Sequence, residues 1–292
     1  MSNRTQIWLY LALLVAACSV LNVLAIRSGG MASPATVKWI IALMWAPAAA
    51  AVITRLIAGR GIGGLSGFGW LPWPPGQLAV GWVVPVVYSA LAFSVIVLAG
   101  FGTFDLQGWS RAASQMGLNV GPWLGVAAFA AFGTLTGLVT ATGEEIGWRG
   151  FLAPALGRET GFWRTNLISS ALWLLYHVPL LLFGGYSGEG TPLWYSLVCF
   201  AALIFIITPF MNAIRLRSGS FWPAALAHAS HNLFIQAVML SIFMPGPKAN
   251  WLVGEFGAVT PIVALVVVGV YFLIAGVPKT AFEVDAREAR PQ

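Results

Sequence analysis

Long apolar segments alternate with short polar ones along the whole chain. Eight apolar segments of about 16–23 residues each are long enough to be spanning helices, whereas barrel strands would alternate strictly over about ten residues. The eight are Ile7–Ile26, Trp39–Thr54, Leu78–Gly100, Gly121–Thr142, Asn166–Leu182, Leu193–Met211, Trp222–Phe243 and Val259–Val277. The pattern therefore predicts an all-α, polytopic membrane protein with about eight transmembrane helices.

The composition agrees with this prediction. Only 8% of the 292 residues are charged and 59% are hydrophobic, whereas a soluble domain carries about 25% charged residues. So few charges exclude both a soluble enzyme and a disordered chain. We expect residues 1–292 to form a single transmembrane domain.

The basic residues indicate which side of the membrane each loop faces. One set of alternate segments, which includes both chain ends, holds 11 of the 15 Lys and Arg residues: Arg4, Arg55, Arg60, Arg149, Arg158, Arg164, Arg215, Arg217, Lys279, Arg287 and Arg290. The other set holds four, namely Arg27, Lys38, Arg111 and Lys248. Because cytoplasmic loops carry an excess of Lys and Arg, we expect both termini in the cytoplasm. The scattered basic residues form no patch with interleaved aromatics, so no nucleic-acid partner is expected.

The two cysteines, Cys18 and Cys199, lie in separate apolar segments and support no disulfide framework. Cys18 ends an Ala-Ala-Cys sequence that resembles a lipoprotein cleavage site. The apolar run continues to Ile26, however, so a simple first span is the favoured interpretation.

Ionisable side chains at membrane depth are costly and suggest function. All three histidines, His177, His228 and His231, lie within the expected spans. Of the nine acidic residues, seven lie in expected loops or the tail, and the exceptions are Glu144 and Glu145. These residues fall into three clusters on three different helices, which favours a shared site.

The spacing within each cluster suggests a division of roles. On a helix, Glu145 and Arg149 are i,i+4 neighbours and can form an ion pair, which leaves Glu144 to face another direction. His228 and Asn232 share one helix face, and His231 lies beside that face. A carboxylate can act as a general base toward water, and an amide or imidazole can stabilise an oxyanion. Two histidines and a carboxylate can instead hold a divalent metal ion.

Structural interpretations stay open for each cluster. His177, or His228 with Asn232, could simply hydrogen-bond a neighbouring helix. For His231 we favour a packing or supporting role, and for Ser230 a local hydrogen bond within its helix.

Three motifs together resemble the CPBP (ABI, CAAX protease-like) family of intramembrane peptidases, which includes the type II CAAX prenyl endopeptidases. They are GEEIGWRGFL at Gly143–Leu152, WLLYH at Trp173–His177 and HASHN at His228–Asn232. The family pattern is EExxxR, FxxxH and HxxxN or HxxxD, and here Trp173 replaces the usual Phe. We expect the family core to cover about residues 121–243.

The resemblance implies an endopeptidase that cleaves a membrane-associated peptide or protein. Glu144 would activate water with help from His177, while His228 and Asn232 would bind the oxyanion; these four are the candidate catalytic residues. Glu145 and Arg149 would support the site, with Arg149 available to a substrate carboxylate. Glu144, His177 and His228 could alternatively bind zinc, although no HExxH sequence is present. The compact chain resembles bacterial relatives, so we expect it in the inner membrane in contact with lipid.

Two other functions remain as alternatives. One is a catalytically inactive scaffold or immunity protein of the same family, and the other is a proton-coupled transporter. For a protease, His177 and His228 should lie about 16 and 9 Å from the cytoplasmic ends of their helices. The fourth span must then continue from Thr142 toward Phe151, and a cavity open to the cytoplasm would supply water.

Overall fold

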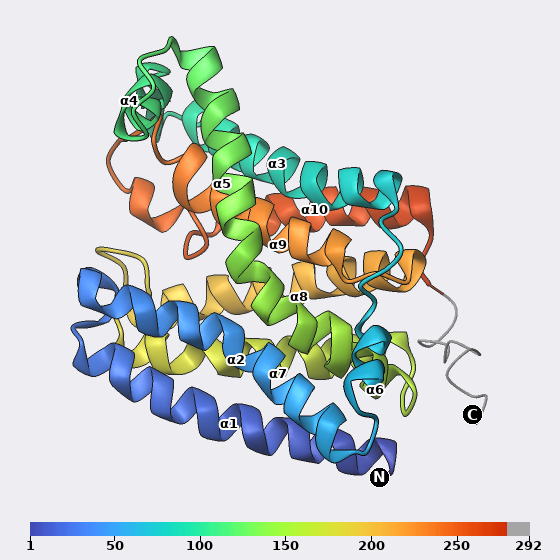
Figure 1. Cartoon of the computed structure of the whole chain (residues 1–292). Helices are drawn as coiled ribbons and strands as arrows, with labels where there is room; N and C mark the ends of the chain where they lie inside the picture. The colour runs from blue at the N-terminus through green and yellow to red at the C-terminus, as the bar shows by residue number, and fades with distance from the viewer. Residues whose placement is uncertain (279–292) are drawn as a thin grey trace.

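The computed structural model describes residues 1–278 and is mostly helical (Figure 1). The helices are α1 (Asn3–Arg27), α2 (Val37–Ile57), α3 (Pro75–Leu98), α4 (Gln107–Gln115), α5 (Pro122–Glu145), α6 (Ala153–Gly157), α7 (Phe162–Phe183), α8 (Leu193–Ser218), α9 (Trp222–Leu233) and α10 (Val259–Ala275). Two π-helices, η4 (Ile146–Leu152) and η5 (Phe234–Val238), continue α5 and α9. Short 3₁₀ turns are η1 (Gly30–Ala32), η2 (Pro34–Thr36), η3 (Ile62–Phe68) and η6 (Ala249–Trp251).

Six helices in the described part of the chain are long and apolar enough to cross a membrane. They are α1, α2, α3, α5 with its continuation, α7 and α8. Of the two remaining expected spans, α10 has 17 residues and α9 only 12 before η5 extends it. The expected span Trp222–Phe243 is too long, because helical structure ends at Val238 and Phe243 begins a short strand. The expected total of eight crossings stays a prediction.

Proline and glycine set several helix boundaries. Proline occupies the first or second position of α3, α5 and α9, where its missing N–H would have no helical partner. Helix α8 ends at Gly219, whose φ of 67° is the left-handed conformation that glycine adopts without a steric penalty. These residues fix where the chain turns between neighbouring helices.

The fourth span continues well beyond Thr142, as predicted. Helix α5, η4 and α6 form one helical segment, Pro122–Gly157, of 36 residues. About 54 Å of helix is more than the roughly 30 Å of hydrocarbon requires, and this segment runs obliquely across the other helices (Figure 1). The extension places Glu144 and Glu145 in the interior of a long segment rather than at its end.

Helix α2 packs closely against this segment at two glycines four residues apart. A Cβ on Gly143 would lie 2.7 Å from the carbonyl oxygen of Met44, and one on Gly147 would lie 2.3 Å from Cβ of Pro47. Small residues spaced in this way let membrane helices approach each other closely. Glycine at these two positions therefore brings α2 against the glutamate-bearing turn.

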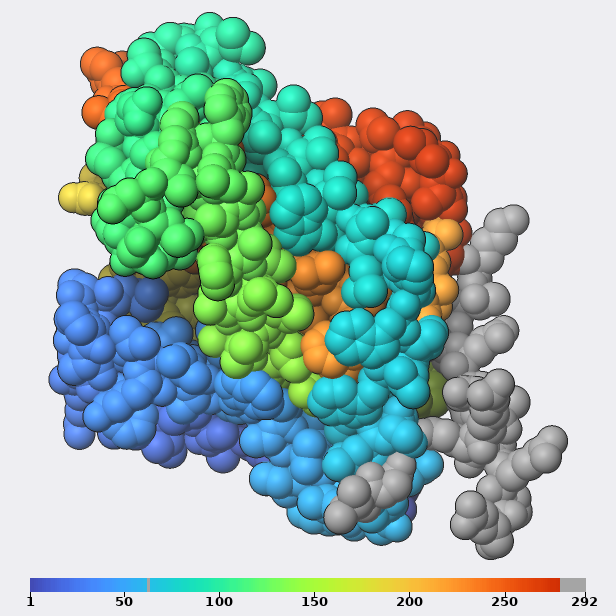
Figure 2. Space-filling model, turned by 45° about the horizontal axis from the view of Figure 1, so that its top comes forward, coloured from blue at the N-terminus to red at the C-terminus, as the bar shows by residue number. Residues whose placement is uncertain are grey.

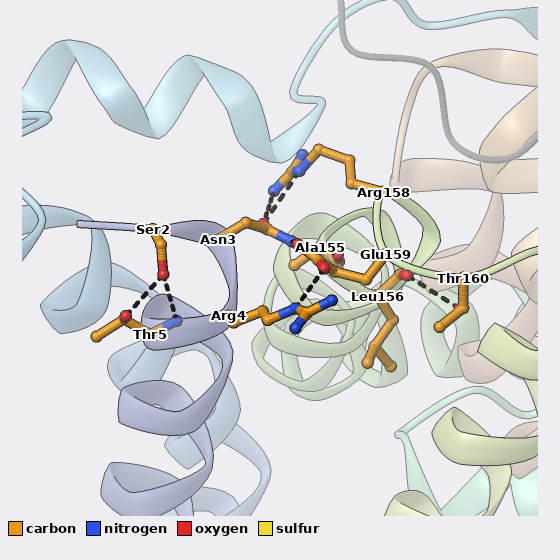
Figure 3. A network of polar contacts seen from close by, with 9 residues as sticks. All are labelled: Ser2, Asn3, Arg4, Thr5, Ala155, Leu156, Arg158, Glu159 and Thr160. Carbon is orange, nitrogen blue, oxygen red and sulfur yellow. Dashed lines mark hydrogen bonds and ion pairs between the residues drawn. The ribbon is translucent and has the colours of Figure 1, made fainter.

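The start of α1 and the end of α10 lie on the same side of the molecule (Figure 1). On that side, polar contacts join the start of α1 to the loop after α6 (Figure 3). Arg4 Nε pairs with Glu159 Oε2 at 2.8 Å, and Arg158 donates to Asn3 Oδ1 at 2.9 Å. The basic residues Lys279, Arg287 and Arg290, which entered the topology prediction, lie outside the described residues.

The opposite side is formed by longer connections. Strands β1 (Gly102–Phe104) and β2 (Phe243–Pro245) pair there as an antiparallel ribbon, next to the amphipathic helix α4. A recess lies between α1 and α2 on one side and α4 with the first part of α5 on the other, on the face shown in Figure 2. We call the side with the start of α1 the terminal side, and the side with the α1–α2, α3–α5, α7–α8 and η5–α10 connections the loop side.

Candidate active site

One cavity brings together the three sequence motifs. It has a volume of about 130 Å³ and is lined by Glu144, Trp173, His177, His228 and Asn232, together with apolar residues of α2 and α8. A water molecule takes up about 30 Å³ in the liquid, so the cavity holds roughly four waters. The four residues expected to act on a substrate therefore line one shared cavity with room for water.

Glu145 and Arg149 form the predicted ion pair. Arg149 Nη1 lies 2.8 Å from Glu145 Oε1, and both side chains are almost fully buried. The Arg149 guanidinium also stacks over the indole of Trp173, 4.6 Å from the ring centroid. Arg149 is absent from the described lining of the cavity, so this geometry does not support a contact between Arg149 and a substrate carboxylate.

Glu144 faces away from that pair, as the helical spacing predicts. Its Oε2 accepts hydrogen bonds from the indole N–H groups of Trp148 at 3.2 Å and Trp173 at 2.9 Å. Neither indole N–H donates to Oε1 of Glu144. No arginine or lysine contact to the Glu144 carboxylate is seen among the described residues, so the carboxylate is positioned by neutral donors.

The two motif histidines are each oriented through Nδ1. His177 Nδ1 lies 2.7 Å from the backbone oxygen of Trp173, which can only accept, so Nδ1 carries the proton. His228 Nδ1 lies 2.9 Å from Glu145 Oε1. The Nε2 atom of each imidazole is therefore available to a group in the cavity. Glu145 accordingly orients His228 as well as pairing with Arg149.

Trp173 connects these groups. Its ring centroid lies 5.9 Å from that of His177 and 5.3 Å from that of His228, while its N–H bonds Glu144. A phenylalanine, which the family pattern has here, would fill the same space but could donate no hydrogen bond. Tryptophan at position 173 therefore adds a hydrogen bond to Glu144 that the family pattern does not predict.

His231 belongs to a second polar network on the cavity wall. Tyr88 OH lies 2.6 Å from its Nδ1, and Glu255 Oε1 lies 2.9 Å from its Nε2. Glu255 also accepts from Tyr186 at 2.6 Å and from Gln236 at 3.0 Å. Both ring nitrogens of His231 are thus occupied, which agrees with its expected supporting role.

Sequence reasoning missed Glu255. Its place in a loop suggested a solvated side chain, whereas it is 5% exposed and lines the cavity. Burial by itself would raise the pKa of Glu255, but the hydrogen bonds from His231, Tyr186 and Gln236 outweigh it and lower the pKa to about 2. No local sequence signal identifies this residue, because its partners come from other segments of the chain.

The arrangement of donors does not favour a metal ion. Within residues 1–278, no group of three or more His, Cys, Asp or Glu side chains is placed to hold one. The zinc hypothesis for Glu144, His177 and His228 stays a prediction.

The two motif histidines lie at different depths in their helices. His177 comes 15 residues after the start of α7 but only six before its end, which is about 9 Å from the loop side. The cavity lining also includes Met31, Tyr186 and Glu255, which lie in loop-side connections. His228 lies six residues after the start of α9, about 9 Å as expected, whereas α7 begins four residues earlier than the hydropathy pattern suggested, so His177 lies about 22 Å from the start of its helix. The side toward which the cavity opens stays a prediction.

Comparison with known proteins supports the family resemblance. Residues 126–234 match the family model described as type II CAAX prenyl endopeptidase Rce1-like. The matched segment contains all three motifs and confirms the resemblance to the CPBP (CAAX protease-like) family. A comparison with curated proteins gives no match.

Proposed function

We propose that this protein is an intramembrane endopeptidase that hydrolyses a peptide bond of a membrane-associated peptide or protein. The observation that carries the proposal is the convergence of Glu144, His177, His228 and Asn232 on one cavity. The match to the Rce1-like family supports a CAAX-type protease role.

In this mechanism, Glu144 acts as the general base. Its carboxylate accepts a proton from a water in the cavity, and the resulting hydroxide oxygen bonds to the carbonyl carbon of the substrate. The carbonyl π electrons move onto oxygen and form an oxyanion. As the oxyanion collapses, the C–N bond breaks and the leaving nitrogen takes the proton from Glu144, which regenerates the carboxylate.

The remaining residues act around this proton transfer. His177, with Nε2 available to the cavity, hydrogen-bonds the attacking water. Asn232 donates from its amide to the oxyanion, and His228 donates from Nε2 when protonated, with Glu145 at Nδ1 stabilising the charged ring. The two indoles hold Glu144 in place while its charge changes.

A cleavage assay in liposomes with a library of membrane-associated peptides tests the proposal. We expect Glu144→Gln and His228→Ala to lower kcat at least about 100-fold, since general acid–base catalysis contributes about 10²–10⁴-fold. Glu189→Gln, which removes an exposed loop carboxylate, is the matched control and should cleave normally. Equal cleavage by wild type and Glu144→Gln would refute the assignment.

The same assay separates the alternatives. Loss of cleavage on chelation, restored by added zinc, would favour metal-dependent hydrolysis by the same residues. A folded wild-type protein that cleaves no member of the library would favour the inactive scaffold. Proton uptake coupled to solute movement, without cleavage, would favour the transporter.

A further inference from the structure

The cavity that holds Glu144 contains a second carboxylate. Glu255, in the connection between η6 and α10, lines the same cavity and is buried. No step of the proposed hydrolysis requires it. Glutamate side chains are almost never fully buried unless they are paired. The groups around Glu255 therefore indicate what this end of the cavity can bind.

The partners of Glu255 within the described chain are neutral. Its carboxylate accepts from the Gln236 amide at 3.0 Å and the Tyr186 hydroxyl at 2.6 Å, and His231 Nε2 lies 2.9 Å away. The described contacts give the Tyr88 hydroxyl no acceptor besides His231 Nδ1, so it donates there and the ring proton lies on Nε2. That tautomer is the uncharged imidazole. Hydrogen bonds thus stabilise the Glu255 charge without a cation beside it.

The Glu255 carboxylate has room for one more donor. A carboxylate offers about four acceptor positions. Oε1 accepts from His231 and Gln236, whereas Oε2 accepts from Tyr186 alone. A cationic donor is favoured at the remaining position, because a hydrogen bond between two ionised groups is roughly twice as strong as one between neutral groups.

The walls of the cavity suit a long apolar stem that carries such a cation. Much of the described lining is aliphatic or aromatic, including Leu180, Phe200, Leu203 and Ile204, and it contains no Lys, Arg or Asp. Lysine and arginine pack their methylene groups along apolar surface and keep the charged end at a polar partner. Apolar walls also strengthen the attraction between opposite charges, because they lower the local dielectric constant.

Tyr186 connects this second carboxylate to the candidate catalytic residues. Its hydroxyl bonds Glu255 Oε2, and its ring centroid lies 6.2 Å from that of His177. The width of one aromatic ring therefore separates Glu255 from a residue expected to contact the attacking water. A substrate group next to the scissile bond can reach Glu255 from there.

We infer that Glu255, held by His231, Tyr186 and Gln236, is a specificity residue that binds a cationic group of the substrate. The cation is a Lys or Arg side chain beside the scissile bond, or a free N-terminal ammonium. The inference rests on the proposed function for its substrate, but binding of the cation can be measured without cleavage.

Binding is measured on the full chain in detergent, with Glu144→Gln introduced so that Glu255 is the one acidic residue left in the described lining. The probe is the peptide Leu-Leu-Lys-Leu-Leu, acetylated and amidated at its ends. Matched probes replace its lysine by norleucine or acetyl-lysine, and a fourth probe is the norleucine peptide with a free N-terminus. The rise in Tm with probe concentration gives each Kd.

We expect the lysine peptide or the free N-terminal peptide to bind about 10–100-fold more tightly than the two neutral probes, as a charged hydrogen bond provides. Whichever of the two binds more tightly identifies the source of the cation. Equal Kd values for all four probes would overturn the inference. This comparison needs no substitution at Glu255, so it holds even where a Glu255 variant does not fold.

The preference should disappear when Glu255→Gln is added and persist when Glu189→Gln, at an exposed loop position, is added instead. A preference that survives Glu255→Gln would assign the cation to another group and refute the role of Glu255. A merely structural role would weaken all four probes by the same factor and leave their ratio unchanged, which would also refute it.

Cleavage then links the subsite to the proposed function. In the wild-type background, kcat/KM should favour cationic over norleucine peptides about 10–100-fold, and Glu255→Gln should bring this ratio close to one. If wild type cleaves no peptide, the proposed function fails, whereas the Kd values still decide whether Glu255 binds a cation.

Discussion

At the residue scale, Trp173 changes how the glutamate is held. It donates one of the two indole hydrogen bonds to Glu144, and its ring contacts those of His177 and His228. A hydrogen bond to a charged group is worth about 1.5–3 kcal/mol. The orientation of the Glu144 carboxylate thus depends on Trp173, although tryptophan in place of phenylalanine looks like a conservative replacement.

Trp173→Phe should keep the packing but lose the hydrogen bond to Glu144. We expect kcat for peptide cleavage to fall about 10–100-fold with little change in KM, since the contact positions the base rather than the substrate. Trp163→Phe, at an exposed position of the same helix, is the control and should leave both constants unchanged. An unchanged kcat in Trp173→Phe would show that Trp148 alone positions the carboxylate.

Glu255 gives a pH-dependent contribution to stability. Its pKa is about 2 in the folded protein and 4.5 ordinarily, so its ionised form is stabilised by folding. That contribution is complete above pH about 4.5 and is lost as the pH falls toward 2; at 1.36 kcal/mol per pKa unit it amounts to roughly 3 kcal/mol.

Glu255→Gln should therefore be less stable than wild type at pH 7, and the difference in Tm should shrink as the pH is lowered to 3. Thermal unfolding in detergent at a series of pH values measures this. Glu189→Gln should parallel wild type throughout. Parallel curves for Glu255→Gln and wild type would contradict the assigned network.

At the element scale, the contact between α2 and the α5–η4 segment determines where the two glutamates lie. Gly143 and Gly147 lie on either side of Glu144 and Glu145, and both meet the α2 backbone at distances that leave no space for a Cβ. Directly after Glu145 the helix widens into η4, and π-helical turns occur frequently at functional sites. The motif thus combines close helix packing with a local change of helical geometry.

Gly147→Ala should disturb this contact. The added Cβ would lie 2.3 Å from Cβ of Pro47 and 2.6 Å from its carbonyl carbon, so α2 has to shift. We expect a loss of about 1–3 kcal/mol of stability, measured as a lower Tm, with reduced cleavage. Gly137→Ala on the same helical segment is the control, because its Cβ would meet Ala229 at an ordinary 3.6 Å. Equal Tm values for the two variants would contradict this account.

At the scale of the whole molecule, the two ends of the described chain lie together, which is the arrangement that an even number of crossings would give. The start of α1 and the end of α10 lie on one side (Figure 1), although six helices alone meet the length and hydropathy expected of a span. Helix α9 extended by η5, and α10, have 17 residues each, or about 26 Å, which is slightly less than the hydrocarbon thickness. Local thinning of the bilayer accommodates a mismatch of this size.

Single cysteines at the two ends test this topology. Ser2→Cys and Val277→Cys, introduced without the native cysteines, should both resist an impermeant maleimide in intact cells and react after permeabilisation. Reaction of one of them alone in intact cells would mean an odd number of crossings, and reaction of both would reverse the orientation.

Local sequence patterns predicted a helical membrane protein, the family resemblance and most of the candidate site. A spanning helix can be recognised in a sequence as a run of about 20 apolar residues. Helical spacing predicted the ion pair between Glu145 and Arg149, and it predicted that the Glu144 side chain points in a different direction. These are local properties, and they depend on side chains within one or two turns of each other.

Contacts between distant groups became visible in the folded structure alone. The indole bond from Trp173 to Glu144, the Glu145–His228 contact and the burial of Glu255 each join segments 20 or more residues apart. The set of residues that line the cavity also depends on where α2, α7 and α8 begin and end relative to one another. Hydropathy measures how favourably each segment by itself transfers from water into the membrane. It therefore carries no information about contacts between segments.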